Sequence, residues 1–180
     1  ELIERYPCLA PMKEQIGHAY EILKEAYESG HKLLIAGNGG SAADAQHIAA
    51  EFIGRFHNER ISLPAVALTV DTSILTSVAN DYSYDVVFSR QVEGLGQEGD
   101  VLWGITTSGN SGNVIKAVEA AKKKGLKTIV SSGKDGGAIR GMADISLVIP
   151  SDVTARIQEM HMLCAHLICE IIDEESWGNE

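Results

Sequence analysis

The sequence predicts an α/β protein built on a parallel sheet of five strands. Two observations support this: short apolar runs alternate with segments of helical periodicity, and each apolar run is nearly continuous rather than alternating in polarity. Continuous runs are typical of strands covered on both faces, and strand–helix alternation favours parallel strands joined by right-handed crossovers. The 180 residues are 44% hydrophobic and 22% charged, which suits one globular domain.

After a loop-like start, residues 12–29 predict the first helix, because Ile16, Leu23 and Tyr27 fall on one stripe and Gly30 suits its C-terminal end. Strands are expected at residues 32–36, 64–68, 100–105, 127–130 and 144–149. Helices are expected between them at residues 42–56, 73–79, 86–95 and 113–124, with a weaker helical turn at 138–142.

The last predicted helix, residues 155–173, is apolar nearly all the way round. Such a helix favours burial on more than one side. The first helix is also rich in apolar residues and does not fit the crossover scheme. We therefore expect both to pack against another subunit, so that the protein is a homo-oligomer.

Composition excludes several classes of partner and location. The formal net charge of -10, from 15 Lys and Arg against 25 Asp and Glu, argues against binding nucleic acid. No apolar stretch approaches the roughly 18 residues that span a bilayer, and the first residues do not resemble a signal peptide, so we expect a cytoplasmic protein. Cys8, Cys164 and Cys169 are odd in number and form no C-x-x-C, which indicates reduced thiols.

Two loops rich in glycine and serine each follow a predicted strand and precede a predicted helix. They are residues 37–41, Gly-Asn-Gly-Gly-Ser, and residues 106–112, Thr-Thr-Ser-Gly-Asn-Ser-Gly. In a parallel sheet, ligands bind outside the carboxyl ends of the strands, where free amides and the dipole of the following helix attract an anion. The four hydroxyls of the second loop favour a phosphate monoester over a planar carboxylate or a large cofactor.

Other readings of these loops remain. Ser41 and Ser111 are also good helix N-caps, and Ser41 with Asp44 resembles a capping box. A dinucleotide fingerprint would need glycines at 37, 39 and 42, but position 42 is Ala42, and after the second strand Asp71 is the only acidic residue in a suitable setting. The P-loop pattern is absent, so we expect no nucleotide cofactor.

Two helices carry candidate catalytic side chains. His47 and Glu51 lie one turn apart on the helix that opens near Ser41, where a carboxylate could act as a base on a carbon next to a carbonyl. The spacing of His47 and Glu51 does not by itself distinguish a catalytic pair from an ordinary solvent-exposed helix face. On the final helix, Gln158, His161 and His166 interrupt an apolar surface; we interpret His161 as a core or interface histidine, whereas His166 is harder to dismiss.

The motifs resemble those of a known family over essentially the whole chain. They are residues 37–47, GNGGSAADAQH; Glu51; Asn80-Asp81; residues 106–111, TTSGNS; and residues 154–161, TARIQEMH. In this combination they are similar to the bacterial phosphoheptose isomerases (sedoheptulose 7-phosphate isomerases) of the sugar isomerase (SIS) domain family. The resemblance implies a flavodoxin-like three-layer αβα sandwich, a single SIS domain over 1–180 whose first 30 residues serve oligomerisation, and a homotetramer with active sites between subunits.

The resemblance also assigns roles to residues. Phosphate would be bound by Ser41, Thr106, Thr107, Ser108 and Ser111, and the sugar by Asn38, Gly39, Gly40, Glu51, Asn80, Asp81 and Gln158. Glu51 and His166 match the catalytic acid/base pair. A zinc site would comprise His47, Glu51, Gln158 and His166, of which the amide is the weakest type of ligand.

The implied activity is that of an aldose-ketose isomerase. Glu51 would move a proton between C1 and C2 of sedoheptulose 7-phosphate through an enediol, giving D-glycero-D-manno-heptose 7-phosphate for ADP-heptose and lipopolysaccharide synthesis. The alternative is a non-enzymatic relative that binds the replication initiator DnaA and shares the run at 155–161. That relative lacks the counterparts of Glu51 and His166, which this chain has. Pentose phosphate isomerases of the same family usually carry appended domains, for which this chain has no room.

Overall fold

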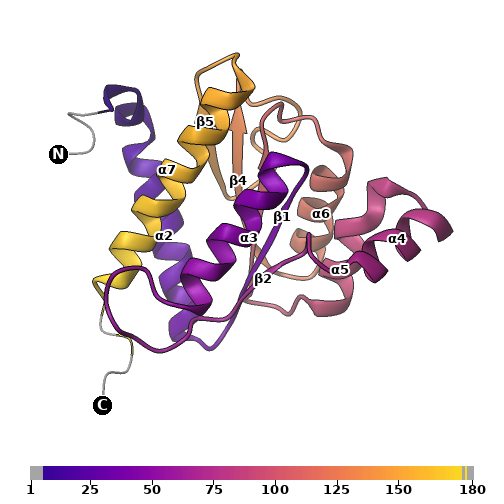
Figure 1. Cartoon of the computed structure of the whole chain (residues 1–180), viewed down its shortest axis with the longest axis horizontal. Helices are drawn as coiled ribbons and strands as arrows, with labels where there is room; N and C mark the ends of the chain where they lie inside the picture. The colour runs from indigo at the N-terminus through magenta and orange to yellow at the C-terminus, as the bar shows by residue number, and fades with distance from the viewer. Residues whose placement is uncertain (1–5, 176, 178–180) are drawn as a thin grey trace.

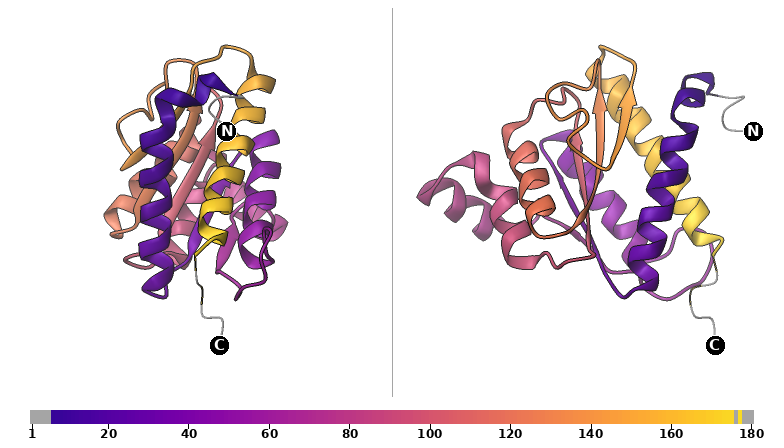
Figure 2. Two further views of the ribbon diagram at one scale, coloured as in Figure 1. Left: turned by 90° about the vertical axis from the view of Figure 1, so that its left-hand side faces the viewer. Right: turned by 180° about the vertical axis from the view of Figure 1, so that it is seen from behind.

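The computed structural model describes residues 6–175 and 177 and has an α/β architecture. Its elements, in chain order, are η1 Pro7–Met12, α2 Lys13–Glu28, β1 Leu33–Gly37, α3 Gly40–Ile53, β2 Ala65–Ala67, α4 Thr72–Asp81, η2 Tyr84–Val86, α5 Val87–Leu95, β3 Val101–Thr106, α6 Gly112–Lys123, β4 Lys127–Gly133, β5 Ile145–Ile149 and α7 Thr154–Asp173. Helices cover both faces of the sheet, so the molecule has three layers (Figures 1 and 2).

All five strands are parallel, in the order β2-β1-β3-β4-β5. This is the flavodoxin-like order, which confirms the predicted fold class. The chain order reverses between β1 and β3, whose last residues lie in register, Gly37 opposite Ile105. Ligands of doubly wound sheets bind at such a switch point, outside the carboxyl ends of the strands.

Two apolar layers hold the sheet between the helices. One cluster joins α2, α3 and α7 to one face, and the other joins α5 and α6 to the opposite face. Every residue of β1 and β3 is buried, as their continuous apolar runs predict. Trp103 in β3 is fully buried and its indole N–H donates to the hydroxyl of Ser131 at 2.9 Å, which satisfies its one polar atom.

The predicted elements are confirmed except at two places. Residues 138–142 form turns rather than helix, because Gly136 and Gly137 just before the segment and Gly141 within it adopt positive φ angles of 95°, 58° and 78° that a helix does not accept. Residues 7–11, expected as loop, belong to the 3-10 helix η1, which has Pro7 in its first turn.

The two terminal helices pack within the single chain, an arrangement that the sequence did not predict. Both α2 and α7 lie on the face of the sheet that α3 also covers, and they pack side by side in Figure 2.

His161 of α7 is 2% exposed and its Nε2 lies 3.0 Å from the carbonyl oxygen of Ser132, so it is a core histidine, as interpreted. Burial lowers the pKa of His161, and the ring is neutral at pH 7. Among the described residues, no helix is long and apolar enough to cross a membrane.

The loop after β3 is locked against the loop after β4 by glycine backbone. Gly109 has a φ of 68°, and a Cβ placed on it would lie 2.0 Å from the carbonyl oxygen of Gly136. The N–H of Ile139 donates to the carbonyl oxygen of Gly109 at 3.0 Å. The second glycine and serine loop is therefore held rigidly by its neighbour.

We expect Gly109→Ala to lower the free energy of unfolding by at least about 2 kcal/mol, because a side chain must be accommodated in a left-handed conformation against backbone atoms. Gly94→Ala on the exposed face of α5, where a Cβ meets nothing within 4 Å, is the matched control and should be neutral or slightly stabilising. Urea denaturation of both variants measures the difference. Equal midpoints for the two would show that the loop contact does not constrain the fold.

Candidate active site

The two glycine and serine loops meet at the switch point of the sheet. The first connects β1 to α3 and the second connects β3 to α6, and these two strands are neighbours in the sheet. Both helices therefore direct their N-terminal ends, and the partial positive charge of their dipoles, toward one place.

Glycine is required at two positions of the first loop, Gly37 and Gly39. A Cβ on Gly37 would lie 2.6 Å from the carbonyl oxygen of Ser41, and Gly39 has a φ of 57°. A Cβ on Gly40 would lie 2.2 Å from Nε2 of Gln158, so the amide of that α7 residue packs directly on the loop. Ser41 is 3% exposed and lies inside α3 rather than at its N-cap, which is Gly39. The capping-box interpretation of Ser41 is therefore wrong.

Hydroxyls of the second loop bond to one another. Oγ1 of Thr106 and Oγ of Ser111 are 2.8 Å apart. Ser111 is the N-cap of α6, but its side chain makes no capping bond to the helix. Ser108 Oγ accepts from the N–H of Asn110 at 3.1 Å. Thr107, between Thr106 and Ser108 in the chain, is half-buried.

An amide pair joins the two loops. Nδ2 of Asn38 donates to Oδ1 of Asn113 and Nδ2 of Asn113 donates to Oδ1 of Asn38, each at 2.9 Å. The hydroxyl of Tyr84 also donates to Oδ1 of Asn38, at 3.2 Å. Asn113 and Tyr84 were not identified as site residues from the sequence. Asn113 was only the first residue of a predicted helix, and Tyr84 lay between two predicted helices. Their roles depend on the strand order, which no local pattern encodes.

Three titratable side chains converge between α3 and α7, which lie side by side (Figure 1). Nε2 of His47 is 2.9 Å from Oε1 of Glu51 and 3.3 Å from Nε2 of His166. Ligand atoms of the three residues all lie within 4.8 Å of one another. Side chains that the sequence placed on two separate helices therefore meet within one chain.

The cluster is half-open to solvent. The side chains of His47 and Glu51 are 51% and 24% exposed, and the ring of Phe56 covers His166 with 5.7 Å between ring centroids. Burial lowers the pKa of His166, and so does His47, while Glu51 acts in the opposite direction. His166 is therefore neutral at pH 7 and can accept a proton or a metal ion through a ring nitrogen.

Two pockets lie along α7. One, of about 410 Å³, is lined by residues that include Met160, Met162 and His166, and the other, of about 420 Å³, by residues that include Asp44 and Gln158. Burial raises the pKa of Asp44, whose Oδ2 has no hydrogen-bond partner among the described residues. Gln158 lies two turns before His166, about 12 Å along α7.

Asn80 and Asp81 lie at the C-terminal end of α4, where both are exposed and Nδ2 of Asn80 donates to Oδ1 of Asp81 at 2.8 Å. The chain then turns so that Tyr84 reaches Asn38. The structure thus brings ligand atoms of His47, Glu51 and His166 within 4.8 Å of one another, and it places the loop residues at the carboxyl edge of the sheet. It leaves Asn80 and Asp81 on a neighbouring surface helix.

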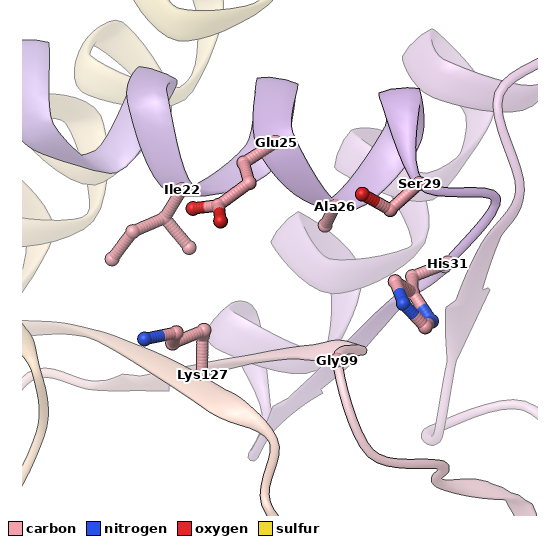
Figure 3. A pocket seen from close by; sticks show the side chains of 7 residues that line it. All are labelled: Ile22, Glu25, Ala26, Ser29, His31, Gly99 and Lys127. Atoms are coloured by element: carbon pink, nitrogen blue, oxygen red, sulfur yellow. The ribbon is translucent and has the colours of Figure 1, made fainter.

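Another pocket lies at the opposite edge of the sheet (Figure 3). Its lining includes Glu25 and Ser29 of the C-terminal part of α2, with His31, Gly99 and Lys127 near the amino ends of β1, β3 and β4. Its volume is about 100 Å³, and its lining includes no residue of the two glycine and serine loops and none of His47, Glu51 and His166. The residues of the switch point, rather than this pocket, form the candidate site.

Residues 8–133 match the family model described as SIS domain. A curated phosphoheptose isomerase from Nitratiruptor sp. is 54% identical over 178 residues, covering 97% of this chain and 95% of its own length. The solved phosphoheptose isomerase of Neisseria gonorrhoeae superposes with a TM-score of 0.90 at 47% identity, covering 95% of this chain and 91% of that one. The enzyme from Francisella tularensis superposes with a TM-score of 0.91 at 40% identity and the same two coverages. With its fold, loops and converging helices, the chain belongs to the phosphoheptose isomerases, a family of SIS-domain enzymes.

Proposed function

We propose that this protein isomerises sedoheptulose 7-phosphate to D-glycero-D-manno-heptose 7-phosphate. The observation that carries the proposal is the convergence of Glu51, His47 and His166, with 2.9 and 3.3 Å between their polar atoms, beside a loop pair suited to a phosphate. Phosphoheptose isomerase is also what the similar curated proteins and solved structures are called.

The phosphate is proposed to bind at the start of α6 and α3, on the hydroxyls of Ser41, Thr106, Thr107, Ser108 and Ser111. Two helix dipoles and several hydroxyls can hold a dianion without a lysine. Asn38, Gly39, Gly40, Asn80, Asp81 and Gln158 are proposed to contact the sugar. Anchoring the phosphate end orients the reacting carbons, so that remote binding energy lowers the barrier.

Proton transfer is assigned to Glu51 and His166. Glu51 takes a proton from one of the two reacting carbons and returns it to the other through an enediol. His166 acts as the acid/base for ring opening and for transfer between the two oxygens, a role that its lowered pKa and neutral ring support. Both groups come from one chain and share His47 as a neighbour.

The residues also fit a zinc ion. Bonds of about 2.0–2.1 Å at tetrahedral angles separate two ligand atoms by about 3.4 Å, and the facing Nε2 atoms of His47 and His166 are 3.3 Å apart. His47, Glu51 and His166 would hold the ion, and Gln158 is the proposed fourth ligand. When bound, zinc would polarise the carbonyl of the sugar as a Lewis acid.

We further propose a cytoplasmic homotetramer with sites between subunits, acting in ADP-heptose synthesis for lipopolysaccharide or related glycans. The half-buried apolar side chains of Met160, Met162 and Leu163 beside His166 support an interface next to the site. Binding to a protein such as DnaA is the second candidate, and the presence of Glu51 and His166, with ligand atoms within 4.8 Å of each other, favours catalysis over it.

Glu51→Gln should lower kcat at least about a hundredfold, because the amide cannot act as a base, while sedoheptulose 7-phosphate still binds. Product formation resolved by mass and calorimetric titration of the variant measure the two effects. Glu93→Gln on α5, an exposed glutamate paired with Arg90, is the control. Turnover close to the wild-type rate in Glu51→Gln would refute the assignment of the base.

Ser111→Ala should lower kcat/KM at least about tenfold, since a hydrogen bond to a charged group contributes roughly 1.5–3 kcal/mol. Steady-state kinetics with sedoheptulose 7-phosphate test this. Ser29→Ala, in the pocket of Figure 3, removes a hydroxyl at the far edge of the sheet and should leave both constants unchanged. An unchanged kcat/KM would remove Ser111 from the phosphate site.

His47→Ala should weaken zinc binding at least about tenfold, because it removes one of two imidazole ligands. Calorimetric titration of metal-free protein with zinc chloride measures the affinity without any turnover. His18→Ala, an exposed histidine on α2, is the matched control. Equal zinc affinity in the two variants would contradict a site at this cluster.

A further inference from the structure

A buried ion pair joins the loop after α3 to the last residue of α7. Nε of Arg60 lies 3.1 Å from Oδ1 of Asp173, and the two side chains are 3% and 2% exposed. Charged side chains are rarely buried this completely unless every charge is paired and hydrogen-bonded.

The guanidinium of Arg60 also binds the end of α3. Nη2 donates to the carbonyl oxygen of Glu51 at 2.8 Å, and Nη1 donates to those of Phe52 and Ile61, each at 2.9 Å. The last carbonyl groups of a helix lack partners within it and carry the negative end of its dipole. A planar cation with several donors suits that position, and one of its acceptors is the backbone of the proposed base.

Asp173 is equally well bound. Its Oδ2 accepts from the backbone N–H of His57 at 2.8 Å and from that of Asn58, and its carbonyl oxygen accepts from the Asn58 amide at 3.0 Å. Burial disfavours the charged form, but these bonds and Arg60 outweigh it and lower the pKa of Asp173. Figure 1 shows the loop after α3 passing the C-terminal end of α7, where these contacts lie.

We infer that Arg60 is a positioning residue for the proposed isomerisation. It fixes the last turn of α3, which carries Glu51, against α7, which carries His166 two turns before Asp173. The two catalytic groups then meet because one rigid, buried cation holds both helices. A displacement of about 1 Å at the reacting groups costs roughly a hundredfold in rate. This inference rests on the proposed function of Glu51 and His166.

The test compares Arg60→Met and Arg60→Lys with Arg90→Met, which removes an exposed arginine on the other face of the sheet. With sedoheptulose 7-phosphate, kcat of Arg60→Met should fall at least about tenfold while KM stays within about twofold, because the phosphate loops lie at the far ends of α3 and α7. Arg60→Lys keeps the charge and some of the donors and should recover part of kcat. Arg90→Met should match the wild type.

Circular dichroism melting curves set an assay temperature at which each variant is folded, and calorimetric titration with zinc chloride gives a readout apart from turnover. Zinc affinity should fall at least about tenfold in Arg60→Met. If that variant does not fold, Asp173→Asn, which keeps the side-chain size, replaces it and should show the same fall in kcat.

An unchanged kcat and zinc affinity in the folded variant would overturn the inference, as would a loss of activity that only follows the unfolded fraction. A wild-type protein that binds but does not turn over sedoheptulose 7-phosphate would instead refute the proposed function.

Discussion

The parallel pairing of β1 with β3 is the constraint on which the site depends. These strands are adjacent in space although α3, β2, α4 and α5 separate them in sequence. The chain leaves β1 for one face of the sheet and β3 for the other, so that α3 and α6 begin on either side of one opening. The two hydrogen bonds between the side-chain amides of Asn38 and Asn113 join the first loop to the start of α6.

A second constraint is the packing of α7 on the face that α3 covers. The apolar surface of α7 buries Ile157, Ile168 and Ile172 in the core and leaves His166 at its edge. Gln158 meets Gly40 and His166 meets His47, so the two helices run in the same direction. The first loop and the titratable cluster therefore lie at successive positions along α3 and α7, with the loop at the start of α3 and the cluster nearer the ends of both helices.

Much of the fold is predictable from the sequence because periodicity is local. The continuous runs of β1 and β3 and the stripe of α2 required no knowledge of their neighbours. The exception at residues 138–142 is equally local, since three positive-φ glycines outweigh a weak helical pattern. The position of the loops was also predictable, because each follows a strand and precedes a helix, although hydroxyl side chains there also suit helix N-caps.

Contacts between distant segments were not predictable in the same way. Spacing along α3 could not separate His47 and Glu51 from a solvated face, and only the family resemblance paired them with His166, 119 residues away from His47. Tyr84, Asn113 and Arg60 gave no signal, because a lone polar residue acquires meaning only from the atoms that the fold brings to it. Capping by Ser41 was a reasonable expectation that failed because α3 begins at Gly40, two residues before the expected start at Ala42.

The facing ring nitrogens of His47 and His166 have a chemical consequence of their own. Nε2 of His47 lies within hydrogen-bonding distance of both Oε1 of Glu51, at 2.9 Å, and Nε2 of His166, at 3.3 Å. A hydrogen on that nitrogen has two competing acceptors, the carboxylate and the second ring, and whenever His166 accepts it, His166 must carry its own hydrogen on Nδ1. A cation bound between the rings would end that competition, because both rings would then present a lone pair on Nε2 and keep their hydrogen on Nδ1.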